Sequence, residues 1–504
     1  MKKVRVRFAP SPTGPLHIGG VKTALYNYLF AKKHGGDFIL RIEDTDQNRF
    51  VPGAEEYILE ALKWCGIEPN EGVGYGGEHK PYKQSERKEI YKEFAQKLVA
   101  QGNAYYGFDS VDELNQLREM AQNKGEAFTY GIYNRNKLNN SLTLPQETVE
   151  KWLIEKPFVV RFKIPENEIV LIEDQIRGAI SIDSNTLDDK IIFKSDGLPT
   201  YHLANIVDDH LMQISHVIRG EEWLPSTALH ILLYKALGLE NPLFAHLPLI
   251  LKPEGKGKLS KRDGDKHGFP VFPLEWKDPE TGEISKGYRE EGYLPEALIN
   301  MLALLGWHPE EGQKEVLSLD ELIKEFSLEK VNKSGAKFSP EKAIWFNHQH
   351  IQLLSCGEIA KRFEQIVKNK NIDFKPEKTL KIVQLVKERI NFIADVWNEA
   401  YFFYKSIDEY DEKSMSKAIK EDSVEVLENL YKTVEKIDFV SKEKTEEVVK
   451  NWISASNLAF GKVMQPFRLA LVGELKGPDV FDIIEILGKE ETLKRIKNLV
   501  AKIS

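Results

Sequence analysis

The segment from Pro12 to Gly20 carries residue types that suit the binding of a nucleotide phosphate. It contains three glycines and one histidine, His17, immediately before an expected helix. Glycines let a base or a phosphate approach the backbone, and a helix start presents free N–H groups and a positive dipole to an anion. The imidazole of His17 would donate to a phosphate oxygen there. The alternative interpretation is a capped helix whose histidine has no chemical role.

A second segment, Lys256 to Gly264, concentrates positive charge between glycines. Its cationic side chains are Lys256, Lys258, Lys261 and Arg262. Such a loop suits gripping a polyphosphate or stabilising the charge on a transferring phosphoryl group. The alternative is a solvated basic loop, because charge runs usually lie at the surface.

The elements around the first segment predict how it is positioned. Residues 4–8 alternate as a short strand, residues 18–33 keep one apolar face as a helix, and residues 38–42 form a second, buried strand. Strand, glycine-containing turn, helix and strand make a βαβ unit with a right-handed crossover and a parallel sheet.

Beyond this unit the pattern changes twice. Residues 105–195 mix polar helical stretches with strand-like segments, which predicts an α+β insert within an α/β sheet whose second half follows it. After about residue 290 strand signals nearly vanish, which predicts an all-α C-terminal region. The stretch 278–291 is typical of a polar surface loop.

Length and composition limit the possible classes of protein. The chain has 504 residues, of which 41% are hydrophobic and 29% charged, so a lone small binding module and a disordered chain are excluded. The net charge of −8 excludes a general polycation. The two cysteines, Cys65 and Cys356, exclude a disulfide framework and indicate a cytosolic protein. The apolar run Leu298–Trp307 is too short for a membrane span and predicts a core helix.

Five segments, in order, resemble the glutamyl type of class I aminoacyl-tRNA synthetase, in its bacterial form. Residues 8–20 are similar to the "HIGH" region of that family, and residues 258–262 are similar to its "KMSKS" loop. Between them, three further blocks match, at residues 41–46, 201–205 and 218–223. The likeness covers most of residues 4–310 and weakens in the helical tail.

The sequence also departs from the family pattern. Gly20 replaces the second histidine of the general motif, and Leu259 and Arg262 replace the methionine and the last serine of the loop. The segment 266–291 is longer than its counterpart and receives no role from the resemblance. Some relatives hold a cysteine-bound zinc in the insert, whereas this insert has no cysteine, so no structural zinc is expected.

The resemblance implies a Rossmann-like catalytic domain that activates L-glutamate with ATP and Mg²⁺. It implies catalytic roles for His17, Lys258 and Lys261, which would stabilise negative charge on the phosphates. The residues implied for ATP binding are His17, Gly19, Gly20, Lys258, Ser260, Lys261 and Arg262.

The resemblance also implies a glutamate pocket. Arg7 and Arg219 would bind carboxylates through their planar forks, Tyr201 would add a hydroxyl, and Glu43 would receive the α-ammonium group. Which arginine faces the side-chain carboxylate is left open. Ala9, Ser11 and Trp223 match further positions of the pocket.

The nucleic-acid partner implied by the family is tRNA(Glu). The resemblance implies a catalytic domain in two halves, residues 1–104 and 196–290, with an acceptor-arm-binding insert at residues 105–195 between them. A stem-contact region is expected at residues 291–375 and an anticodon-binding domain at residues 376–504. Arg389 is a candidate for contact with tRNA, whereas the aromatic run Tyr401–Tyr404 is expected to be packing. We expect a cytoplasmic monomer.

Three alternatives stay open at this point. A non-discriminating enzyme would also glutamylate tRNA(Gln), and a small-molecule adenylate-forming ligase of the pantothenate synthetase type would charge no tRNA. An RNA-binding scaffold without activity would lack the motif residues. The cluster Asp208, Asp209 and His210, with His202 and His216, has the residue types of a metal site but lacks a known ligand spacing, so it is expected to form ion pairs and helix caps.

Overall fold

The computed structural model describes residues 3–309, 314–369, 372, 374–437 and 442–504. The chain divides into two compact units, Met1–Ala343 and Ile344–Ser504, and each is considered by itself.

The first unit begins with the predicted βαβ arrangement. Strands β1 (Arg5–Phe8), β2 (Asp37–Leu40) and β3 (Glu71–Gly72) form a parallel sheet, and helix α1 (Ile18–Lys33) connects β1 to β2. Gly36 ends this crossover in a space that no other residue fits, since a Cβ there would lie 2.2 Å from the carbonyl oxygen of Val4. The predicted helix over 18–33 is confirmed.

A second set of strands continues the sheet on the other side of β1. Strands β9 (His216–Gly220), β10 (Leu243–Leu247) and β6 (Ile169–Asp174) are parallel, and β7 (Gly178–Asp183) is antiparallel at the edge. The Ser215 amide donates to the carbonyl oxygen of Arg5 over 2.9 Å, which joins β9 to β1. The strand order therefore reverses between β1 and β9, and in open α/β sheets ligands bind at such a switch point.

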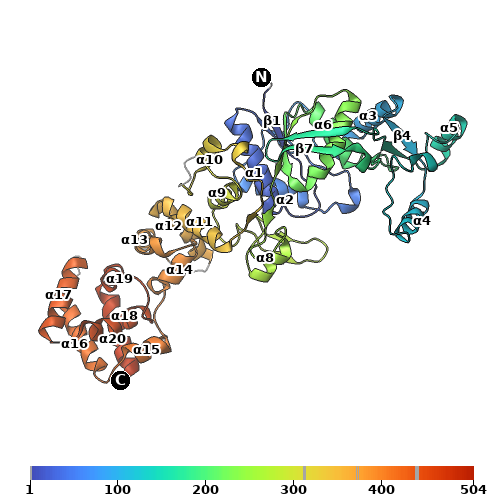
Figure 1. The fold of residues 1–504 in the computed structure, drawn as a ribbon. Coiled ribbons are helices and arrows are strands. Elements are labelled where there is room, and N and C mark those ends of the chain that lie inside the picture. Colours follow the sequence, from blue (N-terminus) through green and yellow to red (C-terminus); the bar gives the residue numbers. More distant parts are fainter. Residues whose placement is uncertain (1–2, 310–313, 370–371, 373, 438–441) are drawn as a thin grey trace. The chain divides into compact units, whose positions relative to one another are not determined.

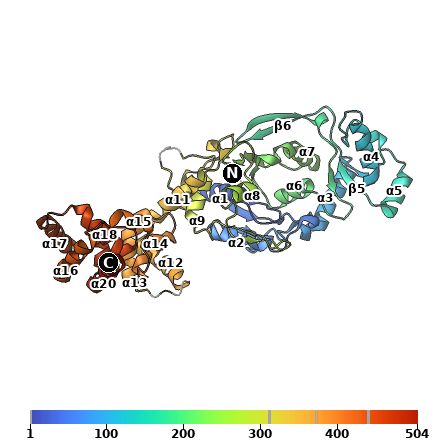
Figure 2. The same ribbon diagram turned by 90° about the horizontal axis from the view of Figure 1, so that it is seen from below.

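Two helices cover this half of the sheet. They are α6 (Tyr201–Leu211) and α7 (Thr227–Leu237), and Figure 2 shows them side by side next to β6. Their buried faces are largely apolar, with Leu203, Ile206, Leu229 and Leu233 almost without solvent exposure. This packing holds the carboxyl ends of β9 and β10 at one edge of the sheet.

The predicted insert contributes strands to two sheets. Its own sheet is antiparallel, with the order β4 (Ala104–Gly107), β5 (Val159–Phe162) and β8 (Ile191–Phe193). Helices α4 (Val111–Gln122) and α5 (Gln146–Glu155) lie with it, far from β1 within the first unit (Figure 1). The hairpin of β6 and β7, by contrast, belongs to the sheet of β9 and β10.

The expectation of a polar surface loop over 278–291 is wrong in part. Short strands β12 (Trp276–Lys277) and β13 (Ile284–Ser285) form a hairpin, and Tyr288 is 1% exposed against Tyr293. The hydroxyl of Tyr57 on α2 (Ala54–Trp64) donates to the Leu274 carbonyl oxygen and accepts from the Leu274 amide. Isolated aromatics in a charged stretch carry no periodic signal, so their burial was not predicted.

The remaining elements of the first unit include two helices with buried apolar residues, α3 (Lys88–Ala100) and α9 (Pro295–Leu304). The run Leu298–Trp307, predicted as a core helix, falls largely on α9, whose Leu298 and Leu302 are buried. No helix among the described residues is long and apolar enough to cross a membrane. The other helices and strands are β11 (Ile250–Leu251), α8 (Lys261–His267), α10 (Leu319–Glu325) and β14 (Ala336–Lys337).

The prediction of an all-α region after about residue 290 is confirmed for the second unit, where every regular element among the described residues is helical, but it is wrong for Ala336–Lys337, which form strand β14 beside β11. Each helix buries one apolar face, for example Ile359, Phe363 and Val367 on α12. The aromatic run Tyr401–Tyr404 is packing, as expected, with Phe402 and Phe403 buried. The helices are α11 (Pro340–Leu353), α12 (Cys356–Asn369), α13 (Pro376–Val386), α14 (Asp395–Ala400), α15 (Glu412–Ala418), α16 (Ser423–Glu435), α17 (Lys442–Ala455), α18 (Phe460–Val472), α19 (Val480–Leu487) and α20 (Lys489–Ile503).

One buried cation, Arg495, ties the last helix to its neighbours. It is 4% exposed and donates to the carbonyl oxygens of Leu471 and Phe402 over 2.5 and 2.8 Å. Arg495→Met should leave these acceptors unpaired and lower the free energy of unfolding of this unit by about 3 kcal/mol. Thermal unfolding followed by circular dichroism measures the loss. Lys494→Met, at an exposed neighbouring position, is the control, and an equal melting temperature for both variants would contradict the assignment.

Candidate active site

A cavity of about 780 Å³ opens at the carboxyl ends of β1, β9 and β10. It lies at the switch point of the sheet, where the turn after β1, the start of α1 and the start of α6 meet. The sequence-predicted residues that line it are Arg7, Ala9, Ser11, His17, Gly19, Gly20, Glu43, Tyr201, Arg219, Trp223 and Lys258. Residues more than two hundred positions apart thus share one cavity.

His17 is the N-cap of α1, and its imidazole has a defined donor. Its Nδ1 accepts from the Gly19 amide over 3.1 Å, so the ring proton lies on Nε2. That Nε2 is buried and has no hydrogen-bond partner among the described residues. Burial, and after it the charge of Lys258, lowers the pKa of His17 to about 4. At neutral pH the group is therefore an uncharged N–H donor in the cavity wall.

The residues after the cationic loop hold His17 in place. The imidazole packs edge-on against Phe272, with 6.0 Å between ring centroids, and the Ile18 amide donates to the Val271 carbonyl oxygen over 2.9 Å. The start of α1 and the segment beyond α8 are therefore in direct contact.

Arg7 belongs to a network of buried charges. Its guanidinium donates to both carboxylate oxygens of Asp209, over 3.1 and 3.4 Å. Arg41, fully buried, pairs with Asp209 and Glu43, and Arg87 pairs with Asp208. Buried charges persist when they are paired in this way.

This network decides the role of the aspartates that resembled a metal site. Asp208 and Asp209 form buried ion pairs, as predicted. In the part of the chain that the structure describes, no group of three or more histidine, cysteine, aspartate or glutamate side chains is arranged to hold a metal ion.

Glu43 presents a carboxylate at the cavity wall. Its Oε1 accepts from Arg41 over 3.1 Å and from the Asn205 amide group over 3.2 Å. Burial raises the pKa of Glu43, and the charge of Arg41 opposes that shift without cancelling it. The site thus holds an acidic group that a bound cation would stabilise in its charged form.

Arg219, at the end of β9, is surrounded by neutral groups. It donates to Tyr201 Oη over 2.8 Å, to Thr227 Oγ1 over 3.0 Å and to His246 Nε2 over 3.0 Å. Among the described residues no aspartate or glutamate forms an ion pair with it, although it is only 4% exposed. A buried guanidinium without a counter-ion favours binding of an anion from the cavity. Arg7, in contrast, already has its counter-ion.

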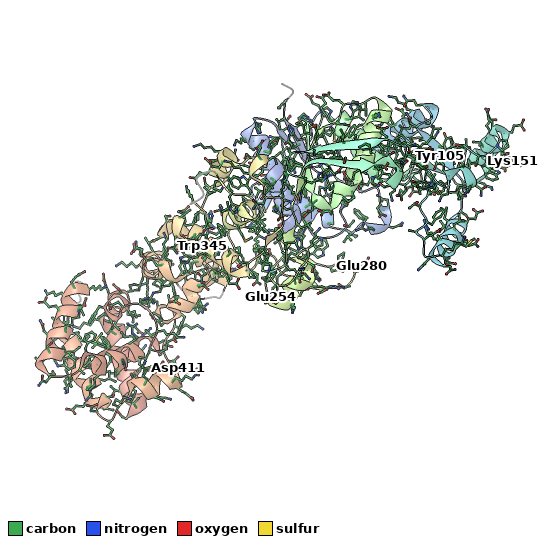
Figure 3. The ribbon with its side chains drawn as sticks, in the orientation of Figure 1. Tyr105, Lys151, Glu254, Glu280, Trp345 and Asp411 are labelled. Atoms are coloured by element: carbon green, nitrogen blue, oxygen red, sulfur yellow. The ribbon has the colours of Figure 1, made fainter. Side chains whose placement is uncertain are left out.

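The cationic loop places its two candidate lysines differently. Lys258 reaches the cavity and pairs with Glu222 over 3.0 Å. Lys261 is the first residue of α8, pairs with Glu283 of the β12–β13 hairpin over 3.1 Å, and does not line the cavity. Figure 3 labels Glu254 in the loop before α8 and Glu280 in the turn of this hairpin.

Ser260 and Arg262 also lie outside the cavity lining. The Ser260 hydroxyl and amide take part in a capping box with Asp263, so this serine is the N-cap of α8. Gly257, with φ +111°, has a backbone conformation that suits only glycine. The structure therefore brings His17 and Lys258 together, and leaves Lys261 tied to the hairpin.

The cavity is also lined by residues that were not predicted as site residues, among them Lys22, Lys194 and Asn205. Lys22 is 2% exposed and donates to the Pro248 carbonyl oxygen over 3.2 Å. Burial lowers its pKa to about 8, against the opposing charge of Glu221. A signal was available for Lys22, because a lysine four residues after Ile18 lies on the apolar face of the helix. Asn205 ends the family-like block at residues 201–205, whereas Lys194 carries no comparable signal.

The chain was compared with known families and structures. Residues 3–345 match the family model described as tRNA synthetases class I (E and Q), catalytic domain, and residues 358–500 match the model described as anticodon binding domain. The glutamate–tRNA ligase of Christiangramia forsetii is 58% identical over 499 residues, covering 99% of each chain. The glutamate–tRNA ligase of Porphyromonas gingivalis is 57% identical over 503 residues, covering 99% of this chain and 98% of its own.

Solved structures agree with these matches. A crystal structure of a glutamate tRNA ligase from Elizabethkingia meningosepticum, in complex with its amino acid, is 54% identical with a TM-score of 0.98 and covers 100% of both chains. The glutamate-tRNA synthetase of Elizabethkingia anophelis is 55% identical with a TM-score of 0.94, covering 99% of this chain and 100% of its own. The chain therefore belongs to the class I tRNA synthetase family for E and Q, and its full-length relatives in that family are glutamate–tRNA ligases.

Proposed function

We propose that this protein activates L-glutamate with ATP and transfers it to the 3′-terminal adenosine of tRNA(Glu). The observation that carries the proposal is Arg219, a buried guanidinium without a counter-ion, in the same cavity as the carboxylate of Glu43. A cavity that holds a buried guanidinium without a carboxylate partner among the described residues, together with the carboxylate of Glu43, suits an amino acid that brings an extra carboxylate and an ammonium group. The family and the full-length relatives support the reaction.

In this proposal the side-chain carboxylate of glutamate faces Arg219 and the hydroxyl of Tyr201. Glu43, held by Arg41 and Asn205, receives the α-ammonium group. Arg7 contributes to the electrostatic field but keeps its bond to Asp209, while Ala9, Ser11 and Trp223 shape the wall. Glutamine would leave Arg219 buried without an anion, at a cost of about 1–3 kcal/mol, which is the basis of discrimination.

ATP would lie with its phosphates against the start of α1. The proton on His17 Nε2 can donate to a phosphate oxygen, and Lys258, which also lines the cavity, adds positive charge. The glutamate α-carboxylate attacks the α-phosphorus and pyrophosphate leaves, so these groups act by positioning and by stabilising charge. Gly19, Gly20, Ser260 and Arg262 complete the proposed ATP-binding set.

Mg²⁺ fits this site as a companion of ATP. Because Mg²⁺ keeps several waters and is held by substrate phosphates with one or two carboxylates, it needs no all-protein cage. The described residues contain no such cage. When bound, the ion would neutralise phosphate charge, and the residues of this chain would keep their roles as donors and counter-charges.

Lys261 must leave Glu283 to act on the phosphates. That ion pair is largely exposed, with 36% and 62% of the two side chains accessible, so little free energy opposes its opening. Lys261→Ala should lower the rate of ATP–pyrophosphate exchange by about 100-fold, since one charge-stabilising group is lost, with an unchanged melting temperature. The control is Lys286→Ala, which removes a lysine beside the hairpin that also forms an exposed ion pair. An unaltered exchange rate in the Lys261 variant would refute its role.

The tRNA would contact both units. We propose that residues 105–195 bind the acceptor arm, residues 291–375 contact the stem and residues 376–504 bind the anticodon. Residues 1–104 and 196–290 are the proposed halves of the catalytic domain. The anticodon assignment is supported by the family match over 358–500. Arg389 is proposed to contact RNA, because 47% of its side chain is exposed and its pair with Glu399, at 3.9 Å, is loose. The presence of both parts in one chain supports a monomer, and its free thiols support a cytoplasmic location.

Aminoacylation of purified tRNA(Glu) and tRNA(Gln), each with glutamate and with glutamine, tests the proposal. Charging of tRNA(Glu) with glutamate alone is the expected result. Glutamylation of both tRNAs would replace it by the non-discriminating activity. If neither tRNA is charged while adenylate still forms, the protein is a small-molecule ligase instead.

A further inference from the structure

A chain of three buried side chains runs behind the cavity, across three neighbouring strands. Asp174 ends β6, His246 lies on β10 and Arg219 lies on β9. His246 Nδ1 lies 2.6 Å from Asp174 Oδ2, and His246 Nε2 lies 3.0 Å from Arg219 Nε. None of the three side chains is more than 4% exposed, and only Arg219 lines the cavity.

The carboxylate of Asp174 is oriented by the backbone. Its Oδ1 accepts from the amides of Ile176 and Arg177, over 3.0 and 2.8 Å. Its Oδ2 accepts from the amide of His246 as well as from the ring. Burial raises the pKa of Asp174, but the hydrogen bonds from His246 and from the Arg177 amide outweigh it, and the net pKa lies below its ordinary value. The group is therefore an ionised carboxylate that only accepts.

This acceptor determines which nitrogen of His246 carries the proton. Because Asp174 cannot donate, the proton lies on Nδ1, and the lone pair of Nε2 points to Arg219. Thr227 Oγ1, 3.2 Å from the same Nε2, accepts from Arg219 Nη2. Burial lowers the pKa of His246, so the ring stays neutral. A proton on Nε2 would instead face the N–H of Arg219 Nε.

We propose that Asp174 and His246 are positioning residues, which hold the Arg219 guanidinium toward the amino-acid substrate without touching it. The inference rests on the proposed function, in which Arg219 binds a carboxylate of glutamate. The imidazole of His246 accepts from Nε of the guanidinium and so fixes that side of it. The same ring separates the carboxylate of Asp174 from Arg219. A carboxylate in direct contact, as Asp209 is with Arg7, would neutralise the charge that the substrate needs.

The variant Asp174→Asn tests the proposal because it changes one atom of the carboxylate. The amide oxygen would stay with the amides of Ile176 and Arg177, so the new NH₂ group would face His246 Nδ1. That donor would force the ring proton to Nε2, against Arg219. The KM for glutamate should rise by about tenfold or more, since a bond to a charged group is lost, whereas the KM for ATP should stay within about twofold. Both are measured by ATP–pyrophosphate exchange with saturating tRNA(Glu).

Variants of His246 test the positioning role independently, even if the Asp174→Asn variant does not fold. His246→Gln offers an amide oxygen to Arg219 that depends on no tautomer, whereas His246→Leu offers no acceptor. We expect a lower KM for glutamate in the glutamine variant than in the leucine variant. Equal values for the two His246 variants would overturn the proposal.

Asp189→Asn is the matched control. Asp189 is 0% exposed, and its carboxylate accepts from the Tyr105 hydroxyl and the Ile164 amide and forms no hydrogen bond with Arg219 or His246. It should change the melting temperature without a selective rise in the KM for glutamate. If Asp174→Asn raises both KM values equally, or leaves that of glutamate unchanged, the positioning role is refuted. Failure of the wild-type enzyme to glutamylate tRNA would refute the proposed function instead.

Discussion

Arg219→Gln is expected to lower kcat/KM for glutamate by about 100- to 1000-fold, with the KM for ATP nearly unchanged. The glutamine side chain keeps a donor but removes a buried positive charge that has no carboxylate partner among the described residues. Charge-assisted bonds to a buried carboxylate are worth about 3–4 kcal/mol in total, and each 1.4 kcal/mol is about tenfold in rate. ATP–pyrophosphate exchange, with glutamate and ATP varied in turn, measures both constants.

Two controls separate substrate binding from stability. Arg289→Gln removes an exposed arginine that pairs with Glu60 and Glu290, and it should leave both constants unchanged. Arg7→Gln should lower the melting temperature, because Asp209 would lose one of its two arginine partners, whereas Arg219→Gln strands no carboxylate. Equal rises of the KM for glutamate and for ATP in the Arg219 variant would contradict its assignment.

The second large effect concerns His17. His17→Ala should lower the rate of adenylate formation by about 100- to 1000-fold, because the unpaired, buried Nε2–H of a residue that lines the cavity is lost as charge develops on the phosphate. His17→Gln, whose amide N–H can reach a similar position, should recover part of that rate. Single-turnover formation of glutamyl-adenylate, with saturating tRNA, measures both variants.

The pH dependence gives a further check on this donor. The pKa of His17 is about 4, so the imidazole stays neutral and gives no inflection of the rate near pH 6.5, the ordinary value for histidine. Lowering the pH toward 4 would add a proton to Nδ1 and break the bond from the Gly19 amide. An inflection near pH 6.5 that disappears in the His17→Gln variant would show a charged histidine and contradict this mechanism.

The β12–β13 hairpin gives the longer segment 266–291 a structural role that the motifs could not. Leu274, just before it, is hydrogen-bonded to Tyr57 of α2, and Glu283 of the hairpin pairs with Lys261, which does not line the cavity. The hairpin thus sets the resting position of one proposed catalytic lysine, while Lys258 already faces the site.

Local signals in the sequence determined much of this protein. The turn of glycines and prolines, the apolar face over 18–33 and the helical tail depend on contacts between near neighbours, so their pattern predicts their structure. The order of five motif blocks indicated the family and the residues that line the cavity. Each block includes the end of a strand or the start of a helix, and the functional side chain lies there.

Only the tertiary structure decided how the charges are paired. Spacing along the chain does not say that Arg7 meets Asp209, or that Arg219 meets none of the described carboxylates, because the partners lie on strands and helices far apart in sequence. Likewise, Asp174 comes from a hairpin within the predicted insert and reaches His246 only because β6 pairs with β10. Strand pairing and burial set these distances, and the distances determine which arginine is free to bind the substrate.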